Sequence, residues 1–236
     1  MSDLRVAVIG MGKMGRALAA LAPERGFRVV ATIDPAAAGD ARVSRESLHD
    51  AQVAIEFSTP DGAVANIRAC LAAQCPVVVG TTGWYGELPA LSEETLKQRG
   101  AMLTAPNFSI GVAVFDRVVA EAARLFSGVP GFEAHIIETH HSAKKDAPSG
   151  TAAMLARTAA IHLGTDVAIT SARVGSVPGT HEVIFDSAFE QVRLVHEARD
   201  RRVFAEGALI AARWLVGRSG VFTMQDVLSS PAGSPT

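Results

Sequence analysis

Five ionisable side chains stand close together in the segment HHSAKKDAPSGT, residues 140–151: His140, His141, Lys144, Lys145 and Asp146. Histidine exchanges protons near neutral pH, and a lysine ammonium group can donate one. The segment closes with Ser149-Gly150-Thr151, a pattern typical of a helix start, where free backbone N–H groups attract a carboxylate. A proton donor, a cation and an anion-binding helix end in one segment suit the reduction of a small acidic imine. The competing interpretation is a solvated surface turn.

A second segment has the spacing of a dinucleotide-binding turn. The sequence GMGKMG follows the apolar run at 4–9 and opens a helical pattern. In a GxGxxG turn the first glycine makes the bend, the second lets the backbone approach a pyrophosphate, and the third allows close helix packing. An aspartate nineteen residues beyond the last glycine can bond a ribose 2′-hydroxyl. The expected cofactor-binding residues here are Gly10, Met11, Gly12, Lys13, Met14, Gly15 and Asp34.

The cofactor expected at this turn is NADH or NADPH. Asp34 should repel a 2′-phosphate, which slightly favours NADH. Lys13 lies in the turn itself and could reach a phosphate, so the preference stays open.

Two further loops follow predicted strands, with sequences GTTG at 80–83 and APNFS at 105–109. Ligands of doubly wound sheets bind beyond the carboxyl ends of the strands, and small hydroxyl residues beside glycine suit a nicotinamide ribose or carboxamide. The alternative for each loop is a plain turn. The segment FSTP at 57–60 ends another strand and could line the same crevice. The cofactor-binding residues expected from the two loops are Gly80, Thr81, Thr82, Ala105, Pro106, Asn107 and Phe108.

The apolar pattern around these loops predicts the elements that position them. We expect strands at 4–9, 27–33, 53–57, 77–79 and 102–104, and helices at 14–24, 62–74 and 88–98. Strands alternating with helices imply crossover connections and a parallel sheet covered on both faces. The fold predicted for this part is an α/β, Rossmann-like doubly wound parallel sheet.

The pattern changes after residue 108. We expect helices at 110–126 and 151–163, and strands at 132–140, 167–174, 181–186 and 189–197, the last three joined by short turns. This pattern predicts an open, mostly antiparallel sheet. A helical pattern at 203–216 could return to the first domain. The predicted organisation is therefore a dinucleotide-binding domain at 1–108 and 202–236, and a smaller α+β substrate-binding and oligomerisation domain at 109–201.

The bulk composition excludes several functional classes. The chain has 236 residues with a net charge of -2, so no global field draws it to nucleic acid or to a membrane. We find no signal peptide and no uninterrupted apolar stretch of about 18 residues, so we expect a cytoplasmic protein without a membrane span. Cys70 and Cys75 have neither a zinc-site nor a redox-pair spacing, and we expect ordinary buried thiols. No metal site is predicted.

The ionisable segment also resembles a known family. Glu138-Thr139-His140-His141, Lys144 and the run DAPSGTA from Asp146 are similar to the signature of the dihydrodipicolinate reductase (4-hydroxy-tetrahydrodipicolinate reductase) family. The resemblance extends over essentially the whole chain, through GTTG and APNFS to the C-terminal run FTMQDVL at 222–228.

The resemblance implies NAD(P)H-dependent reduction of a cyclic dicarboxylate to tetrahydrodipicolinate in the diaminopimelate route to lysine. It implies that His140 is the general acid or base, that Lys144 donates a proton, and that His141 contacts substrate. Gly150 and Thr151 match groups that hold a substrate carboxylate, and Asp34 with the three loops matches the cofactor shell. The family, together with exposed strands of the small sheet, also implies a homotetramer.

Two positions depart from the family pattern. Ser142-Ala143 replaces residues that are basic in many relatives, and Ile210 stands where several relatives have an arginine or lysine. Arg213, one turn later, is the nearest candidate to replace that cation.

Three other functions compete with this one. They are a different two-domain amino-acid dehydrogenase, a non-catalytic nucleotide-binding protein, and a zinc hydrolase that uses His140, His141 and His181. The last is disfavoured because adjacent histidines on a strand point to opposite faces.

Overall fold

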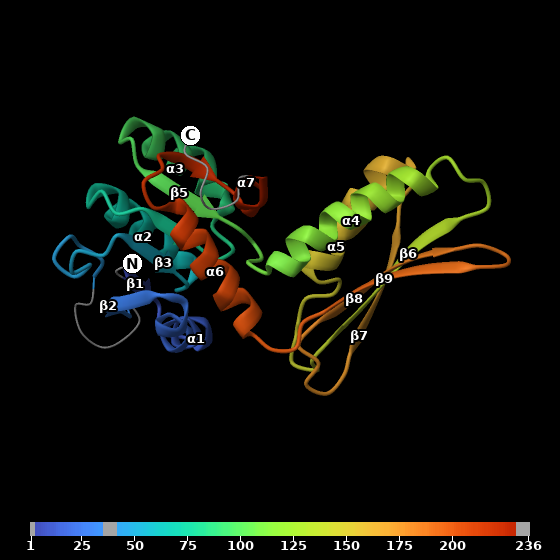
Figure 1. Ribbon diagram of the computed structural model, residues 1–236, viewed down its shortest axis with the longest axis horizontal. Helices are drawn as coiled ribbons and strands as arrows, with labels where there is room; N and C mark the ends of the chain where they lie inside the picture. Colours follow the sequence, from blue (N-terminus) through green and yellow to red (C-terminus); the bar gives the residue numbers. More distant parts are fainter. Residues whose placement is uncertain (1–2, 35–41, 230–236) are drawn as a thin grey trace. The chain divides into compact units, whose positions relative to one another are not determined.

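The computed structural model describes residues 3–34 and 42–229, and its chain divides into two compact units (Figure 1). Unit 1 comprises Met1–Ser109 and Arg202–Thr236, and unit 2 comprises Ile110–Arg201. The first junction lies one residue beyond the expected boundary at 108/109.

Unit 1 is built on a six-stranded sheet whose neighbouring strands pair in parallel, in the order β10-β5-β4-β3-β1-β2. This arrangement confirms the predicted doubly wound parallel sheet. The strands are β1 (Leu4–Ile9), β2 (Phe27–Ile33), β3 (Val53–Glu56), β4 (Val77–Val79), β5 (Ala101–Thr104) and β10 (Gly220–Phe222).

Helices cover both faces of this sheet. On one face α1 and α6 pack against each other, on the other α2 and α3 do so, and α7 packs beside α6. Because both faces are covered, residues on either side of a strand must be apolar, which is why Val6 to Ile9 are all buried. The helices are α1 (Lys13–Leu21), α2 (Pro60–Ala72), α3 (Leu88–Lys97), α6 (Arg202–Leu215) and α7 (Met224–Ser229), with short 3₁₀ turns η1 (Pro23–Arg25) and η2 (Tyr85–Glu87).

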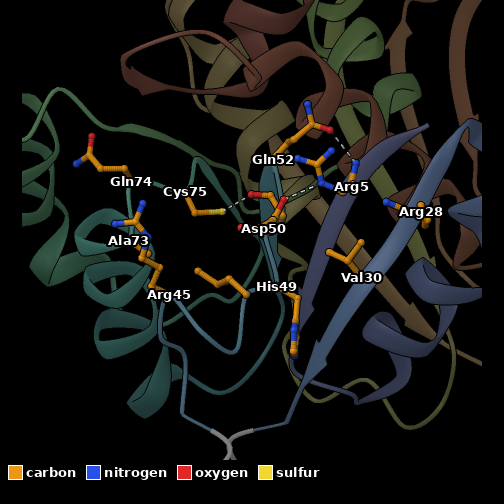
Figure 2. A pocket seen from close by; sticks show the side chains of 12 residues that line it. Arg5, Arg28, Val30, Arg45, His49, Asp50, Gln52, Ala73, Gln74 and Cys75 are labelled. Carbon is orange, nitrogen blue, oxygen red and sulfur yellow. Dashed lines mark hydrogen bonds between the residues drawn. The ribbon is translucent and has the colours of Figure 1, made fainter. Parts of the chain in front are cut away.

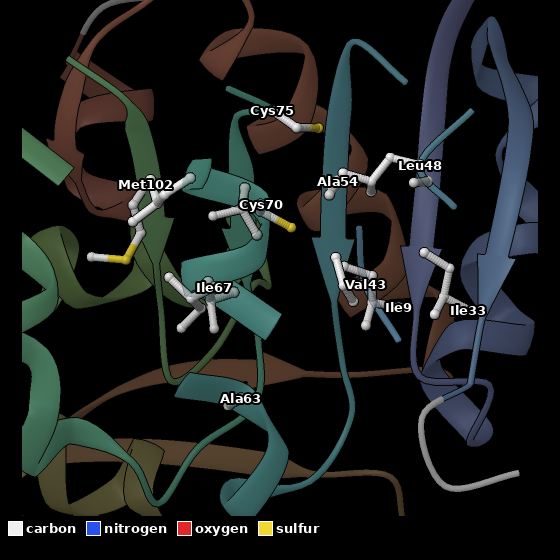
Figure 3. Close-up of a cluster of buried hydrophobic side chains, with 14 of the residues drawn as sticks. Ile9, Ile33, Val43, Leu48, Ala54, Ala63, Ile67, Cys70, Cys75 and Met102 are labelled. Atoms are coloured by element: carbon white, nitrogen blue, oxygen red, sulfur yellow. The ribbon is translucent and has the colours of Figure 1, made fainter. Parts of the chain in front are cut away.

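A hydrophobic core lies between the sheet and helices α2 and α3 (Figure 3). Ile9, Ala54 and Met102 reach it from the sheet, and Ile67 and Cys70 from α2. Cys70 and Cys75 are buried and free, as the sequence predicted, and burial raises the pKa of the Cys75 thiol to about 11.

Unit 2 has a four-stranded sheet in the order β7-β6-β8-β9, with helices α4 (Ile110–Phe126) and α5 (Gly150–Leu163) packed on one face. Strand β6 is parallel to β7 and antiparallel to β8, which is antiparallel to β9. The sheet is therefore mixed and mostly antiparallel, as predicted. The strands are β6 (Glu133–His140), β7 (Ala168–Arg173), β8 (Thr180–Asp186) and β9 (Gln191–Glu197).

The structure corrects two expectations about elements. Strands β7 and β8 follow each other in the chain but are not neighbours, because β6 pairs between them. Helix α5 connects β6 to β7, and such a crossover produces a parallel pair. Two short elements near the C-terminus were not predicted from the sequence: β10, of three residues, and α7, of six. In residues 3–34 and 42–229, no helix combines the length and apolar character that a membrane crossing requires.

Candidate active site

The predicted glycine turn lies at the carboxyl end of β1, the strand at which the order of strands in the sheet reverses. Strand β2 pairs with β1 on one side and β3 pairs with it on the other, so the strands that follow β1 are added toward opposite edges of the sheet. A crevice at such a switch point is the usual ligand site of a doubly wound sheet. The turn from Gly10 to Gly15 connects β1 to α1 at this point.

Each of the three glycines in the turn occupies a different environment. Gly10 has a φ of +87°, and a Cβ there would overlap the backbone carbonyl of Phe57. A Cβ at Gly15 would overlap the carbonyl oxygen of Gly10, so this glycine lets helix α1 pack against the turn. A Cβ at Gly12 would meet nothing within 4 Å. Gly12 therefore keeps its outer side open, as a backbone that approaches a ligand must.

The three predicted cofactor loops of unit 1 meet around Phe57, which the sequence analysis placed only as a possible lining residue. Its backbone packs against Gly10, and its ring occupies the space that a side chain at Gly80 would need. The ring of Phe108 lies 5.8 Å from the ring of Phe57. One aromatic side chain at the end of β3 thus brings the segments 10–15, 80–83 and 105–109 together.

The residues at this edge fit a nicotinamide dinucleotide. Helix α1 begins at Lys13 with no acidic residue in its first turn and no side-chain cap on its amide groups, so an anion can take that place. The Thr81 hydroxyl is buried and has no hydrogen-bond partner in residues 3–34 and 42–229. Asp34 is half-buried directly after β2, next to residues 35–41, which lie outside the described part of the chain.

A buried carboxylate that sequence reasoning missed lies next to these loops. Glu56 is fully buried at the end of β3. Its Oε1 accepts hydrogen bonds from the Ser58 amide at 3.1 Å, the Ser58 hydroxyl and Asn66 Nδ2 at 3.3 Å. These bonds hold the start of the FSTP segment against α2.

In unit 2 the predicted acid His140 belongs to a buried cluster with Glu138 and His181. Glu138 and His140 are two residues apart on β6, so both face α5, and Glu138 accepts a hydrogen bond from His140 Nδ1. His181 on β8 packs its ring edge-on to His140, with 5.1 Å between centroids. The period of two along β6 was the signal that could have identified Glu138 from sequence.

Arg173 supplies the positive charge that keeps Glu138 ionised. Its Nη2 donates to Glu138 Oε1 at 2.8 Å. Burial acts to raise the pKa of Glu138, but hydrogen bonds, with Arg173 the strongest contributor, outweigh burial and lower the pKa to about 2. The carboxylate therefore stays charged throughout the physiological range.

Both histidines of the cluster are kept neutral near pH 7. Burial lowers the pKa of His140, although the Glu138 carboxylate acts in the opposite direction. Burial, with a smaller contribution from the neighbouring His140, lowers the pKa of His181 to about 4. Because Nδ1 of His140 donates to Glu138, the proton of the neutral ring is assigned to Nδ1, and Nε2 is left as a proton acceptor.

The absence of a side chain at Gly179 leaves room for the His140 ring. Gly179, just before β8, has a φ of +152°, and a Cβ there would lie 2.9 Å from His140 Nε2.

The predicted anion-binding helix start is joined to the histidine cluster. Ser149 caps α5 by accepting from the Ala152 amide at 3.1 Å, and its hydroxyl lies 3.2 Å from His181 Nε2. Gly150 begins the helix and Thr151 follows, so both residues lie in its first turn, at the positive end of the helix dipole.

The two remaining predicted residues, Lys144 and His141, differ in their relation to this cluster. Lys144 Nζ pairs with Asp146 at 2.8 Å, and its charge acts on His140. Asp146 therefore holds the ammonium group of the proposed proton donor. His141 follows the last residue of β6 and is not part of the Glu138–His140–His181 cluster.

Arg213 does not behave as a substitute substrate cation. Its guanidinium stacks on the Phe27 ring, 4.7 Å from the centroid, and donates to the Arg25 carbonyl oxygen. It is thus held at the amino end of β2, and the expectation that it replaces a cation at Ile210 is wrong.

The structure also changes which residues could bind the metal ion of a zinc hydrolase, one of the alternative functions. Among the described residues, Glu138, His140 and His181 have potential ligand atoms within 4.8 Å of one another, and His141 is not among them. In this structure Arg173 forms an ion pair with Glu138, and the same carboxylate bonds His140 Nδ1.

A glycine turn at the switch point of a doubly wound sheet, in one chain with a buried acid–histidine cluster at a helix start, defines a class: the two-domain, nucleotide-dependent oxidoreductases. Family models narrow this class. The model described as dihydrodipicolinate reductase, N-terminus, matches residues 4–108, and the one described as dihydrodipicolinate reductase, C-terminus, matches residues 111–228.

Curated relatives agree. The chain is 34% identical to the 4-hydroxy-tetrahydrodipicolinate reductase of Christiangramia forsetii over 96% of this chain and 98% of the relative. It is 37% identical to that of Rubrobacter xylanophilus over 96% of this chain and 99% of the relative. The chain belongs to the dihydrodipicolinate reductase family, which confirms the resemblance seen in the sequence, and it is an oxidoreductase with a nicotinamide cofactor.

Solved structures show the same fold. A dipicolinate-bound dihydrodipicolinate reductase from Paenisporosarcina has a TM-score of 0.80 at 23% identity, covering 94% of this chain and 97% of that chain. Aspartate dehydrogenase from Thermotoga maritima has a TM-score of 0.53 at 13% identity, covering 89% of this chain and 96% of that chain. The alternative of another two-domain amino-acid dehydrogenase therefore rests on general architecture alone.

Proposed function

We propose that the chain catalyses the NAD(P)H-dependent reduction of 4-hydroxy-tetrahydrodipicolinate to tetrahydrodipicolinate, in the diaminopimelate route to lysine. The observation that carries this proposal is the combination, in a member of this family, of the dinucleotide turn with the buried Glu138–His140 pair at the start of α5. The reaction removes the substrate hydroxyl as water and adds a hydride and a proton to the ring.

The residues of unit 1 bind and orient the cofactor. The amides at the start of α1 and the open side of Gly12 hold the pyrophosphate. Thr81, whose buried hydroxyl lacks a partner in the described residues, and the loop at 105–109 orient the nicotinamide end. When bound in reduced form, the cofactor supplies the hydride.

The residues of unit 2 hold the substrate and manage its protons. The backbone and hydroxyl groups of Gly150 and Thr151 donate hydrogen bonds to one substrate carboxylate, and His141 contacts the substrate. Lys144 donates the proton that accompanies the hydride. For this step its ammonium group must leave Asp146, with which it is paired, and bind the substrate. His140, neutral and oriented by Glu138, accepts and returns protons through Nε2.

The finer features of this function are part of the same proposal. Asp34 makes NADH the slightly favoured cofactor, while Lys13 leaves NADPH possible. The substrate is a small cyclic dicarboxylate, the enzyme acts in the cytoplasm, and it assembles as a homotetramer.

The test is a paired assay with NADH and NADPH, following cofactor absorbance with enzymatically generated substrate. Substitution of Lys144→Ala should lower kcat by about a hundredfold, with little change in nucleotide affinity, because proton donation is lost while unit 1 is untouched. Lys145→Ala removes an equal charge from the exposed neighbouring position and serves as the matched control.

If kcat of K144A equals that of K145A, Lys144 is not the donor. If the wild-type protein binds either nucleotide tightly but reduces no cyclic imine, the chain is a nucleotide-binding protein and the proposed reaction is wrong.

A further inference from the structure

A basic cavity lies at the amino end of the unit 1 sheet (Figure 2). It has a volume of about 590 Å³ and is lined at the start of β1 and β2, by the turn before β3, and by the end of α2. Its charged and polar lining includes Arg5, Arg28, Arg45, His49, Asp50 and Gln52.

This cavity is separate from the nucleotide edge of the same sheet. Arg5 is the second residue of β1, whereas the glycine turn follows Ile9, the last. Four residues of extended strand span about 13 Å. The cavity therefore belongs to neither the cofactor loops nor the histidine cluster of unit 2.

Two of its arginines are placed side by side by the sheet itself. Arg5 and Arg28 are register partners on the parallel strands β1 and β2, so their side chains leave the same face, as Figure 2 shows. Like charges at such neighbouring positions repel each other and destabilise the pair. An arrangement of this kind is stabilised when an anion binds between the two groups.

Within the described part of the chain, neither Arg5 nor Arg28 forms an ion pair. Arg5 Nε donates to the backbone oxygen of Asp50 at 2.9 Å, a neutral acceptor. The Arg28 side chain is exposed and makes no hydrogen bond or ion pair with any residue in the ranges 3–34 and 42–229.

A third arginine, Arg45, lines the cavity across from the two strands (Figure 2). Its charge acts weakly on the neighbouring Glu46, which is not part of the lining. Among the described residues that line the cavity, Asp50 contributes the one carboxylate, so the three guanidinium groups exceed the carboxylates there by two. This local excess occurs in a chain whose net charge is -2.

We propose that this cavity binds a small dianion carrying phosphate or carboxylate groups, held by Arg5, Arg28 and Arg45. Guanidinium groups present paired N–H donors that match both kinds of oxyanion, and a dianion balances the excess charge. The ligand is bound in addition to cofactor and substrate, at a second site on the nucleotide-binding unit.

The test is calorimetric titration of the full-length protein, saturated with NADH so that the glycine turn is occupied. Inorganic pyrophosphate is the phosphate probe and succinate the carboxylate probe, each at low ionic strength because salt screens such contacts. The variants are Arg28→Gln and Arg45→Gln. Arg157→Gln, which removes an exposed arginine from unit 2, is the matched control.

We expect one or both probes to bind the wild-type protein, and R28Q and R45Q each to weaken that binding roughly tenfold or more while R157Q leaves it unchanged. Binding of pyrophosphate alone identifies a phosphate ligand, and binding of succinate alone identifies a carboxylate ligand. The proposal is wrong if neither probe binds, or if R28Q and R45Q bind as R157Q does. Because the readout is binding, either result is independent of reductase activity, and circular dichroism of each variant verifies its fold.

Discussion

Gly179 is the residue on which the position of His140 depends most directly. A methyl group there would lie 2.9 Å from His140 Nε2, closer than carbon and nitrogen approach without strain. The ring would have to rotate away from Glu138 or push β8 aside. Gly179 therefore determines where the His140 ring lies, and with it the geometry that we propose for proton transfer.

We predict that Gly179→Ala lowers kcat about tenfold to a hundredfold with little effect on the KM for nucleotide, because a displaced His140 loses part of its acid–base contribution. Gly175→Ala is the control, since Gly175 also has a positive φ, +53°, but a Cβ there meets nothing within 4 Å. Steady-state kinetics with both variants make the comparison. Equal kcat values for the two variants would show that His140 tolerates the methyl group.

The buried His181 predicts how stability depends on pH. Its pKa falls from 6.5 in the unfolded chain to about 4 in the folded protein, so between these values the unfolded state binds the proton more readily. Stability is therefore full above about pH 6.5 and falls as the pH drops toward 4, by about 3 kcal/mol in total. Glu138 acts at lower pH, since its contribution is lost as the pH falls from 4.5 toward about 2.

Urea denaturation between pH 7.5 and 4.5 measures this effect. The free energy of unfolding of His181→Gln should change less over the range than that of the wild-type protein. His196, whose pKa is also lowered by burial, titrates in both proteins and cancels in the comparison. Parallel curves for the two proteins would rule out His181 as the source.

At the scale of elements, two glycines in the turn between β1 and α1 have different roles: Gly10 is needed for the fold, and Gly12 leaves room for the nucleotide. Gly10→Ala should destabilise unit 1 by about 2 kcal/mol or more, because φ is +87° and the methyl group overlaps the Phe57 carbonyl. Gly12→Ala should fold normally, because its φ is -67° and its outer side is open.

The same substitution at Gly12 should nevertheless weaken NADH binding about tenfold, since the methyl group stands where the backbone approaches the pyrophosphate. Thermal melting and fluorescence titration of NADH measure the two effects separately. Unchanged NADH affinity in G12A would place the dinucleotide elsewhere.

At the scale of the whole molecule, we consider the face of the unit 2 sheet opposite α4 and α5 as a surface for the proposed homotetramer. Helices α4 and α5 cover one face, and the other carries Val195, which is 54% exposed, next to the ion pair of Arg193 with Glu182. An uncovered sheet face with apolar residues is a surface on which copies of the chain can meet.

Light scattering should therefore give a mass of about 98 kDa, four times the 24.6 kDa chain. Val195→Lys should shift the mass downward because it places a charge in the contact. Ile161→Lys, on the exposed side of α5, should leave the mass unchanged. A wild-type mass of one or two chains would contradict the tetramer.

The sequence by itself determined the parallel sheet, the glycine turn, the strand–loop–helix of the HHSAKKDAPSGT segment and the family. These features depend on local patterns: continuous apolar strands, glycines at fixed spacing and a helix-capping serine.

Only the tertiary structure decided which distant residues complete the site. Glu138 and His140 share a face of β6, but Arg173 reaches them from β7, His181 from β8 and Gly179 from the segment before it. The placement of β6 between β7 and β8 brings these residues together. Strand order depends on pairing between remote segments, and no local pattern encodes it, so the surroundings of His140, the proposed acid or base, became visible only in the folded chain.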